Sequence, residues 1–261
     1  MQTIPKPIVL SISGHDPSGG AGIQADIEVL AALGCHAATV ISCLTTQDSC
    51  NVLELIPLNP QQMTDQIDLL FLDYTIHAIK IGLLGSADTA LAVGRLLARH
   101  PEIPVVLDPI LAAGGGTVLA SQQLIDCLVR QIIPHTTLIT PNSQEARKLT
   151  GLESLDDCAD YLMQKGVDAV LITGTHEAST EVINTLYRPA QSPMKWPWPR
   201  LENSYHGSGC TIASASAAGL AKGLSIEEAV ISAQQYTWES LAAGWQPGKG
   251  QHIPNRQFRQ Q

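Results

Sequence analysis

The stretch His206–Thr211 carries the residue types most suited to chemistry in this chain. Gly207 and Gly209 allow the backbone to turn sharply and to approach a ligand closely. The small residues that follow predict a buried helix beginning near Cys210, whose free N–H groups and positive dipole end favour a bound phosphate. The same helix end would lower the pKa of the Cys210 thiol. The pattern therefore indicates phosphoryl transfer, with an ordinary loop entering a core helix as the alternative.

Further candidate residues stand at the ends of predicted strands. Asp108 ends an apolar strand and suits a Mg²⁺ ion that carries nucleotide phosphates through water, or it caps the following loop. Asn142 and Glu145 either form a helix cap with its partner or reach metal-bound water and phosphate. Asp26, on the first turns of a helix, either points inward toward a ligand or is solvated. Ligands bind beyond the carboxyl ends of strands in open parallel sheets, so one cleft is expected there. The other residues placed at these strand ends are Gly14, Asp16, Thr45, Gln47, Gly82, Thr173 and Gly174.

Short apolar segments alternate with helical segments along most of the chain. The predicted strands are 8–13, 37–44, 77–82, 105–108, 137–140 and 168–173, and the predicted helices are 21–33, 60–72, 87–99, 122–133, 155–165 and 226–243. This alternation predicts an α/β fold with a mostly parallel central sheet and helices on both faces. Two further strands, 182–187 and 194–201, have no helix between them and predict an antiparallel edge. No repeat or linker is evident, so residues 1–261 are predicted to form a single domain.

Composition excludes some classes of partner. The net charge of −9 argues against nucleic acid or an anionic membrane as the main partner. The six cysteines are scattered without a C-x-x-C pair, which suits a reducing cytoplasm better than a disulfide framework or a zinc site. The N-terminal residues predict no signal peptide, and no apolar stretch is long enough to span a bilayer.

With these residues laid out, the chain resembles the hydroxymethylpyrimidine/phosphomethylpyrimidine kinases of thiamin biosynthesis, within the ribokinase-like superfamily. The matching motifs are residues 13–26, 45–47, 80–84, 107–109, 139–142 with 145–146, and 206–211. They occur in the family's order and cover nearly the whole chain. The resemblance implies a ribokinase-like fold and ATP-dependent phosphorylation of 4-amino-5-hydroxymethyl-2-methylpyrimidine, first to the monophosphate and then to the diphosphate. It also implies a homodimer.

The resemblance assigns roles to individual residues. The aminopyrimidine would be held by Gly14, Asp26, Thr45, Gln47 and Leu83, with Gln47 offering both a donor and an acceptor to the ring. Leu83 stands where the family commonly has methionine, which is a mild change.

The transferring phosphate would meet an anion hole formed by the backbone of Gly207, Ser208, Gly209 and Cys210. Cys210 occupies the position of an aspartate base in the superfamily's sugar kinases, so its thiolate would accept the hydroxyl proton. ATP and its metal would be held by Asp108, Asn142, Glu145 and Thr173, with Asp108 and Glu145 reaching Mg²⁺ through water.

Two lysines of the family pattern are absent. The family often has Lys-Gly-Gly-His where this chain has Thr173–His176, and an Ala-Lys-Ser-Gly loop where this chain has Ala112–Gly115. Each missing lysine removes a charge that would help to neutralise phosphate. Related pyridoxal kinases have threonine near the first position, so a pyridoxal or pyridoxine kinase is one alternative. A pyrimidine-binding protein without turnover is the other.

Overall fold

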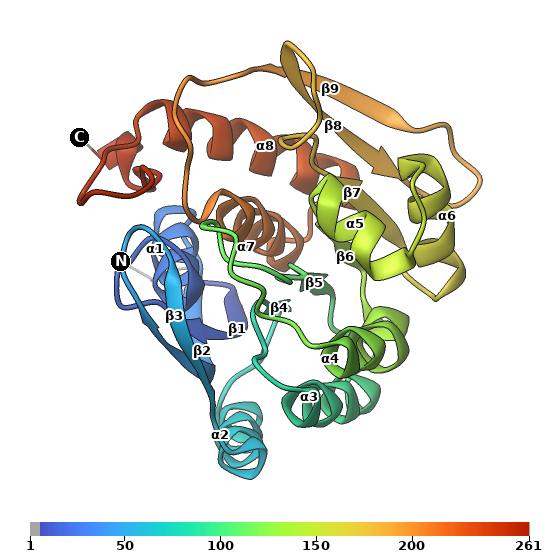
Figure 1. Ribbon diagram of the computed structural model, residues 1–261. Coiled ribbons are helices and arrows are strands. Elements are labelled where there is room, and N and C mark those ends of the chain that lie inside the picture. The colour runs from blue at the N-terminus through green and yellow to red at the C-terminus, as the bar shows by residue number, and fades with distance from the viewer. Residues whose placement is uncertain (1–5, 261) are drawn as a thin grey trace, which may run out of the picture.

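Aliphatic segments of the chain form a single nine-stranded sheet in the computed structural model, which describes residues 6–260 (Figure 1). The strands are β1 (Ile8–His15), β2 (His36–Gln47), β3 (Val52–Pro57), β4 (Ala78–Ile81), β5 (Val105–Leu107), β6 (Leu138–Ile139), β7 (Ala169–Ile172), β8 (Glu181–Tyr187) and β9 (Met194–Pro199). They lie in the order β3-β2-β1-β4-β5-β6-β7-β8-β9. Strands β2, β1, β4, β5, β6 and β7 are parallel, and β8 and β9 are antiparallel. The predicted α/β fold with an antiparallel edge is therefore confirmed.

The opposite edge of the sheet is antiparallel as well, which the sequence analysis did not predict. Strand β3 pairs with β2 along Val52–Pro57. Its side chains are mostly exposed, and Leu53 is 84% exposed. Because the ladder to β2 rather than core packing holds this strand, its sequence lacks the pattern of a buried strand.

Eight α-helices cover the two faces of the sheet in the part of the chain that the structure describes. They are α1 (Gly22–Ala32), α2 (Pro60–Asp73), α3 (Ala87–Arg99), α4 (Gln122–Cys127), α5 (Ser143–Thr150), α6 (Leu155–Gln164), α7 (Ser208–Ala221) and α8 (Ile226–Ala242). Side chains of α1, α7 and α8 pack with Val9, Ala78 and Val106 on one face. Side chains of α2 to α6 pack with Leu10 and Ile79 on the other.

Helix ends follow the predicted caps with one exception. Ser225 and Glu228 form the predicted capping box of α8, and Ser86 caps α3. The predicted helix 122–133 is instead α4 followed by a π-helical turn, Leu128–Ile132, and a 3₁₀ turn, Ile133–His135. Pro134 stands in the last turn and ends the helical segment as a whole, because proline has no N–H group to donate. No helix among residues 6–260 is both long enough and apolar enough to cross a membrane.

Candidate active site

A cavity of about 510 Å³ lies beyond the carboxyl ends of β1, β4, β5, β6 and β7. The predicted site residues that line it are Gly14, Thr45, Gln47, Leu83, Asp108, Asn142, Glu145, Thr173, Gly207, Ser208, Gly209 and Cys210. The prediction that polar strand ends form one cleft is confirmed for these residues and for Asp16, whereas Gly82 and Gly174 do not line the cavity. Asp26 does not line the cavity.

The turn before α7 has the geometry of an anion site. Gly207 has φ +84°, a conformation that favours glycine, and α7 begins at Ser208, two residues before the predicted start. A Cβ atom on Gly207 would collide with the Gly20 carbonyl oxygen, while one on Gly209 would lie 3.6 Å from Asp108 Oδ1. The free N–H groups of the first helical turn therefore stand beside the end of β5.

Burial decides the state of the Cys210 thiol, contrary to the sequence-based expectation. The side chain is 4% exposed, and burial raises its pKa to about 12. The charge of Lys80 opposes this shift, and the charges of Asp108 and Asp26 reinforce it. The expected lowering of the thiol pKa by the helix end is therefore wrong.

Asp26 points inward, as expected, but it meets a buried lysine instead of the cavity. Its carboxylate lies 2.9 Å from Lys80 Nζ and accepts hydrogen bonds of 2.6 Å from Ser11 and Ser214. Asp26 and Lys80 are fully buried, so a direct contact of Asp26 with a ligand in the cavity is not present here. Burial alone would lower the pKa of Lys80, but Asp26, Cys210 and Asp108 together raise it.

Lys80 was missed as a site residue, although a signal existed. Strand β4 is fully buried, and a charged residue in such a strand needs a charged partner. Since side chains alternate along a strand, Lys80 falls on the same face as Ala78, under α1 and α7. It therefore places a positive charge beneath the floor of the cavity.

Two carboxylates share the middle of the cavity. Glu145 closes a capping box with Asn142, accepting from its backbone N–H at 2.9 Å, so the cap predicted as one alternative is confirmed. The same side chain also lines the cavity, so the two interpretations are compatible. Burial and the charge of Asp108 raise the pKa of Glu145 to about 8, and burial raises the pKa of Asp108 to about 6 despite Lys80.

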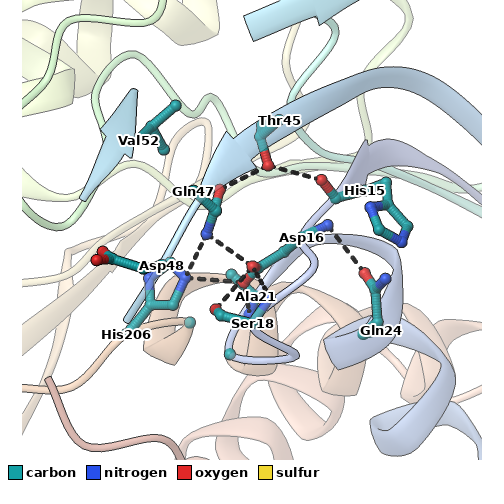
Figure 2. A network of polar contacts seen from close by, with 12 residues as sticks. His15, Asp16, Ser18, Ala21, Gln24, Thr45, Gln47, Asp48, Val52 and His206 are labelled. Carbon is teal, nitrogen blue, oxygen red and sulfur yellow. Dashed lines mark hydrogen bonds and ion pairs between the residues drawn. The ribbon is translucent and has the colours of Figure 1, made fainter. Parts of the chain in front are cut away.

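Asp16 and Thr45 hold the side chain of Gln47, and His206 in turn contacts Asp16 (Figure 2). Gln47 Nε2 donates to Asp16 Oδ1 at 2.7 Å, and His206 Nε2 lies 2.9 Å from Asp16 Oδ2. The Thr45 hydroxyl is shared between Gln47 Oε1, at 2.8 Å, and the His15 carbonyl, at 2.9 Å. Burial alone would raise the pKa of Asp16, but hydrogen bonds from His206 and Ser18 lower it to about 2. Asp16 is therefore an acceptor at neutral pH, and Gln47 Nε2 must face it.

The C-terminal segment contributes a second residue that the sequence analysis missed. Arg256 has a fully buried side chain, donates to the Gly20 carbonyl and to Thr211 Oγ1 at 3.0 Å, and pairs with Glu28 at 3.0 Å. It thus ties the loop after β1 to the start of α7. The sequence carries no local signal for this contact, because the partners lie far away along the chain.

Comparison with known proteins places these features in a family. The family model described as phosphomethylpyrimidine kinase matches residues 16–255. The hydroxymethylpyrimidine/phosphomethylpyrimidine kinase of Rhizobium meliloti is 35% identical over 243 residues, which cover 90% of this chain and 91% of that protein. The thiamine biosynthesis bifunctional protein ThiED of Geobacter sulfurreducens is 34% identical over 252 residues, which are 94% of this chain but only 51% of that protein.

Solved structures share the fold. Bacillus subtilis pyridoxal kinase, in an ADP complex, has a TM-score of 0.89 and 25% identity, covering 98% of this chain and 100% of that one. Phosphomethylpyrimidine kinase from Clostridium difficile 630 has a TM-score of 0.79 and 31% identity, covering 90% and 100%. The family match over residues 16–255 agrees with the relatives named above. The chain belongs to the hydroxymethylpyrimidine/phosphomethylpyrimidine kinases, a family of phosphotransferases with the ribokinase-like fold.

Proposed function

We propose that this protein uses ATP to phosphorylate 4-amino-5-hydroxymethyl-2-methylpyrimidine and then its monophosphate. The observation that carries this proposal is the fixed amide of Gln47 in the same cavity as the glycine turn before α7. The Gln47 amide can hydrogen-bond to the edge of a ring, and the glycine turn can bind a phosphate. A structural neighbour, Staphylococcus aureus pyridoxal kinase, has been solved with AMP-PCP, which supports ATP as the donor.

The orientation of Gln47 selects the ring edge. One Nε2 hydrogen is committed to Asp16, and His206 Nε2 must donate its own hydrogen to the ionised Asp16, so it cannot accept the second one. The second Nε2 hydrogen and a lone pair of Oε1 are left for a ligand. A 4-aminopyrimidine offers a ring nitrogen to the former and an exocyclic N–H to the latter.

The carboxylates at the centre of the cavity suit a magnesium ion held through water. Asp108 Oδ2 is buried without a hydrogen-bond partner among residues 6–260, and Glu145 lies close enough for Asp108 to raise its pKa. No cluster of three or more His, Cys, Asp or Glu side chains suited to a metal occurs in that range, so water and phosphate oxygens would complete the shell. When bound, Mg²⁺ would neutralise nucleotide phosphates, with Asp108 and Glu145 as its protein-side partners and Asn142 and Thr173 beside the phosphates.

Each residue of the site would have a separate role in the reaction. The N–H groups of Gly207–Cys210 donate hydrogen bonds to the phosphoryl oxygens and stabilise the negative charge on them. Lys80 adds a fixed positive charge below these N–H groups. Gly14 and Leu83 pack against the pyrimidine beside Gln47. Cys210 takes the hydroxyl proton as a thiolate; because its thiol is protonated in the free protein, that first proton must pass to bulk water beforehand. Asp26 acts from below by holding Lys80.

Purified protein with Mg-ATP tests this function directly. We expect conversion of the hydroxymethylpyrimidine to the mono- and diphosphate. Phosphorus NMR detects the products, and a coupled assay measures the release of ADP. Absence of ADP release with this substrate would reject the proposal. Calorimetry on the same sample separates the alternative of a pyrimidine-binding protein, which would bind the pyrimidine tightly without phosphate transfer.

Pyridoxal phosphorylation is the second candidate. Staphylococcus aureus pyridoxal kinase, solved with pyridoxal, has a TM-score of 0.87 and 27% identity to this chain, covering 97% of this chain and 94% of that one. Comparing kcat/KM for the two substrates decides between them, and we expect the pyrimidine to be preferred because Gln47 offers it a paired donor and acceptor.

We further propose that residues 1–261 act as one domain, as a homodimer, in the cytoplasm. The continuous sheet supports the first point, and the resemblance to the family supports the second. The six cysteines are free thiols, which suits a reducing compartment. Light scattering would test the dimer.

A further inference from the structure

The loop between β7 and β8, residues 173–180, forms one side of the cavity. Thr173, Thr175 and His176 line the cavity wall. Backbone hydrogen bonds of 3.0 and 3.1 Å tie Thr173 to the segment before α5. The residues that follow Gly174 belong to no strand or helix, so other contacts must fix their position.

Arg200, directly after β9, holds this outer part of the loop by three backbone carbonyls. Its Nε donates to the Ser179 carbonyl at 3.2 Å, Nη1 to the Thr175 carbonyl at 2.8 Å and Nη2 to the Glu177 carbonyl at 3.0 Å. A guanidinium group carries its N–H donors in a rigid planar fork, whereas the ammonium group of lysine is a compact point charge. The loop therefore folds around a group that only arginine provides.

A second arginine holds the same loop from α5. Arg147 Nη1 and Nη2 donate to the two carboxylate oxygens of Glu177, at 2.8 and 3.1 Å. Isolated ion pairs at a surface contribute little, but a bidentate arginine–carboxylate pair is an exception. Glu177 thus joins α5 to the end of β9, because its side chain binds Arg147 and its carbonyl binds Arg200.

We propose that Arg200 is a positioning residue for nucleotide binding, and that its guanidinium fork holds Thr175 and His176 in place at the cavity wall. The inference rests on the proposed kinase function, which puts Thr173, at the start of this loop, beside the phosphates. Gln47 stands on β2, which four strands separate from β7. A displaced loop should therefore weaken the binding of nucleotide and leave the binding of the pyrimidine unchanged.

The substitution Arg200→Met removes the fork. We expect KM for ATP and Kd for ADP to rise about tenfold, with kcat and KM for the pyrimidine within about twofold of the wild type. Arg188→Met is the matched control. Arg188 lies in the connection between β8 and β9, pairs with Glu227 at 2.9 Å and does not line the cavity, so its removal should leave all four constants unchanged.

A lysine variant separates the fork from the charge. Among residues 6–260, Arg200 is the only lysine or arginine that lines the cavity, so its charge by itself would attract ATP. Arg200→Lys keeps the charge and loses the fork. We expect its KM for ATP to match that of Arg200→Met. A wild-type KM for ATP in Arg200→Lys would overturn the inference, because the charge alone would then be sufficient.

Limited proteolysis tests the loop without the kinase reaction. A protease that cleaves after glutamate should act slowly at Glu177 in the wild type, because its carboxylate and its carbonyl are both bound. We expect faster cleavage at Glu177 in Arg200→Met, with the fragments identified by mass spectrometry. Cleavage after Glu153, whose side chain is 98% exposed, should proceed at the same rate in both proteins.

The two measurements together distinguish this inference from the proposed function. Faster cleavage at Glu177 with weaker ADP binding supports the inference even if the pyrimidine is not the substrate. Unchanged cleavage in folded Arg200→Met would overturn it even if the pyrimidine is phosphorylated. Faster cleavage with an unchanged Kd for ADP would overturn the link between the loop and the nucleotide.

Glu177→Gln is the second variant, should Arg200→Met fail to fold. It removes the charge that Arg147 binds and leaves the Glu177 carbonyl in place, so we expect a smaller rise in Kd for ADP. Glu153→Gln is its control, because Glu153 lies 3.9 Å from the same arginine without bidentate contact. Equal Kd values for these two variants would contradict the inference.

Discussion

Cys210 is the side chain on which the proposed proton transfer depends. Burial raises its pKa to about 12, so the thiol is protonated at neutral pH. A base acts only when ionised, and kcat/KM reports the ionisation of the free enzyme, so we expect kcat/KM to rise with pH between about pH 7 and pH 10 instead of levelling off. Cys210→Ser should lower kcat by about two to four orders of magnitude, with little change in the Kd for the pyrimidine. Steady-state kinetics and calorimetry measure these quantities.

The control for Cys210 is Cys127→Ser, a half-buried thiol outside the cavity. Its kcat should match that of the wild type. A Cys210→Ser enzyme with kcat within about threefold of the wild type would show that backbone N–H groups and fixed charges carry the reaction.

Asp16 controls which way Gln47 faces, so its removal should weaken selection of the ring. In Asp16→Asn the new amide can donate as well as accept, and Gln47 loses its fixed orientation. We expect KM for the pyrimidine to rise about tenfold with kcat nearly unchanged, measured beside Asp48→Asn. Asp48 is exposed and accepts only from its own turn. Equal KM values for the two variants would contradict the orienting role.

The Asp16 carboxylate also makes the free energy of unfolding depend on pH at low pH. Its pKa is about 2 in the folded protein and 3.8 in the reference state. Its contribution is therefore fully present above pH 3.8 and is lost as the pH falls through about 2. That contribution is about 2 kcal/mol, so urea unfolding should show the wild type losing more stability than Asp16→Asn over this range.

Residue types revealed the cleft better than they revealed its charges. Gln47, Asp108 and Glu145 were predictable because polar side chains at the carboxyl ends of parallel strands face the edge of the sheet where ligands bind. The partner of Asp26 was not, because Lys80 follows it by 54 residues and sits in an otherwise apolar strand. Pairing across the sheet determines this contact, and the sequence shows only that a buried lysine needs some partner.

The pair of β4 and α1 carries a further prediction. Lys80→Met would leave the Asp26 charge buried without its partner, so we expect a loss of about 3–5 kcal/mol in the free energy of unfolding. Adding Asp26→Asn should restore part of it. Arg99→Met, which removes the exposed pair with Asp68, should cost about 1 kcal/mol or less. Urea unfolding measures the stability of Lys80→Met, of the double variant and of Arg99→Met. A Lys80→Met protein as stable as Arg99→Met would contradict the conclusion that Lys80 balances the buried charge of Asp26.

The two ends of α7 offer a matched pair of glycines. Gly207 (φ +84°) would place a Cβ against the Gly20 carbonyl, whereas Gly223 (φ +80°) has open space around it. Both alanine variants suffer the same backbone strain, of order 1 kcal/mol, but Gly207→Ala must also displace the anion turn. We expect its kcat to fall about a hundredfold and that of Gly223→Ala to stay at the wild-type value. Equal kcat values would exclude a role for this turn.

Elements with a core-facing pattern were predictable, and elements held from outside the core were not. The capping boxes of α5 and α8 are local signals and were found. Strand β3 depends on its ladder to β2, and the end of α4 depends on a π-helical turn that packs beside α3. Neither dependence is visible in the side chains of the segment itself.

Arg256 connects the C-terminal segment to two segments beside the candidate active site. This residue, near the C-terminus, joins Gly20, Thr211 and Glu28, so the loop after β1 and the start of α7 are held by one guanidinium group. Arg256→Met leaves the buried Gly20 carbonyl oxygen without its donor, at a cost of about 1–3 kcal/mol, whereas Thr211 Oγ1 keeps its hydrogen bond to the Gly207 carbonyl. Because Gly20 and Thr211 belong to segments beside the anion turn, we expect a lower melting temperature together with a higher KM for ATP. Arg259→Met removes an exposed arginine paired with Glu239 and should change neither. If Arg256→Met lowered the melting temperature but left KM for ATP unchanged, the contacts of Arg256 would contribute to stability alone.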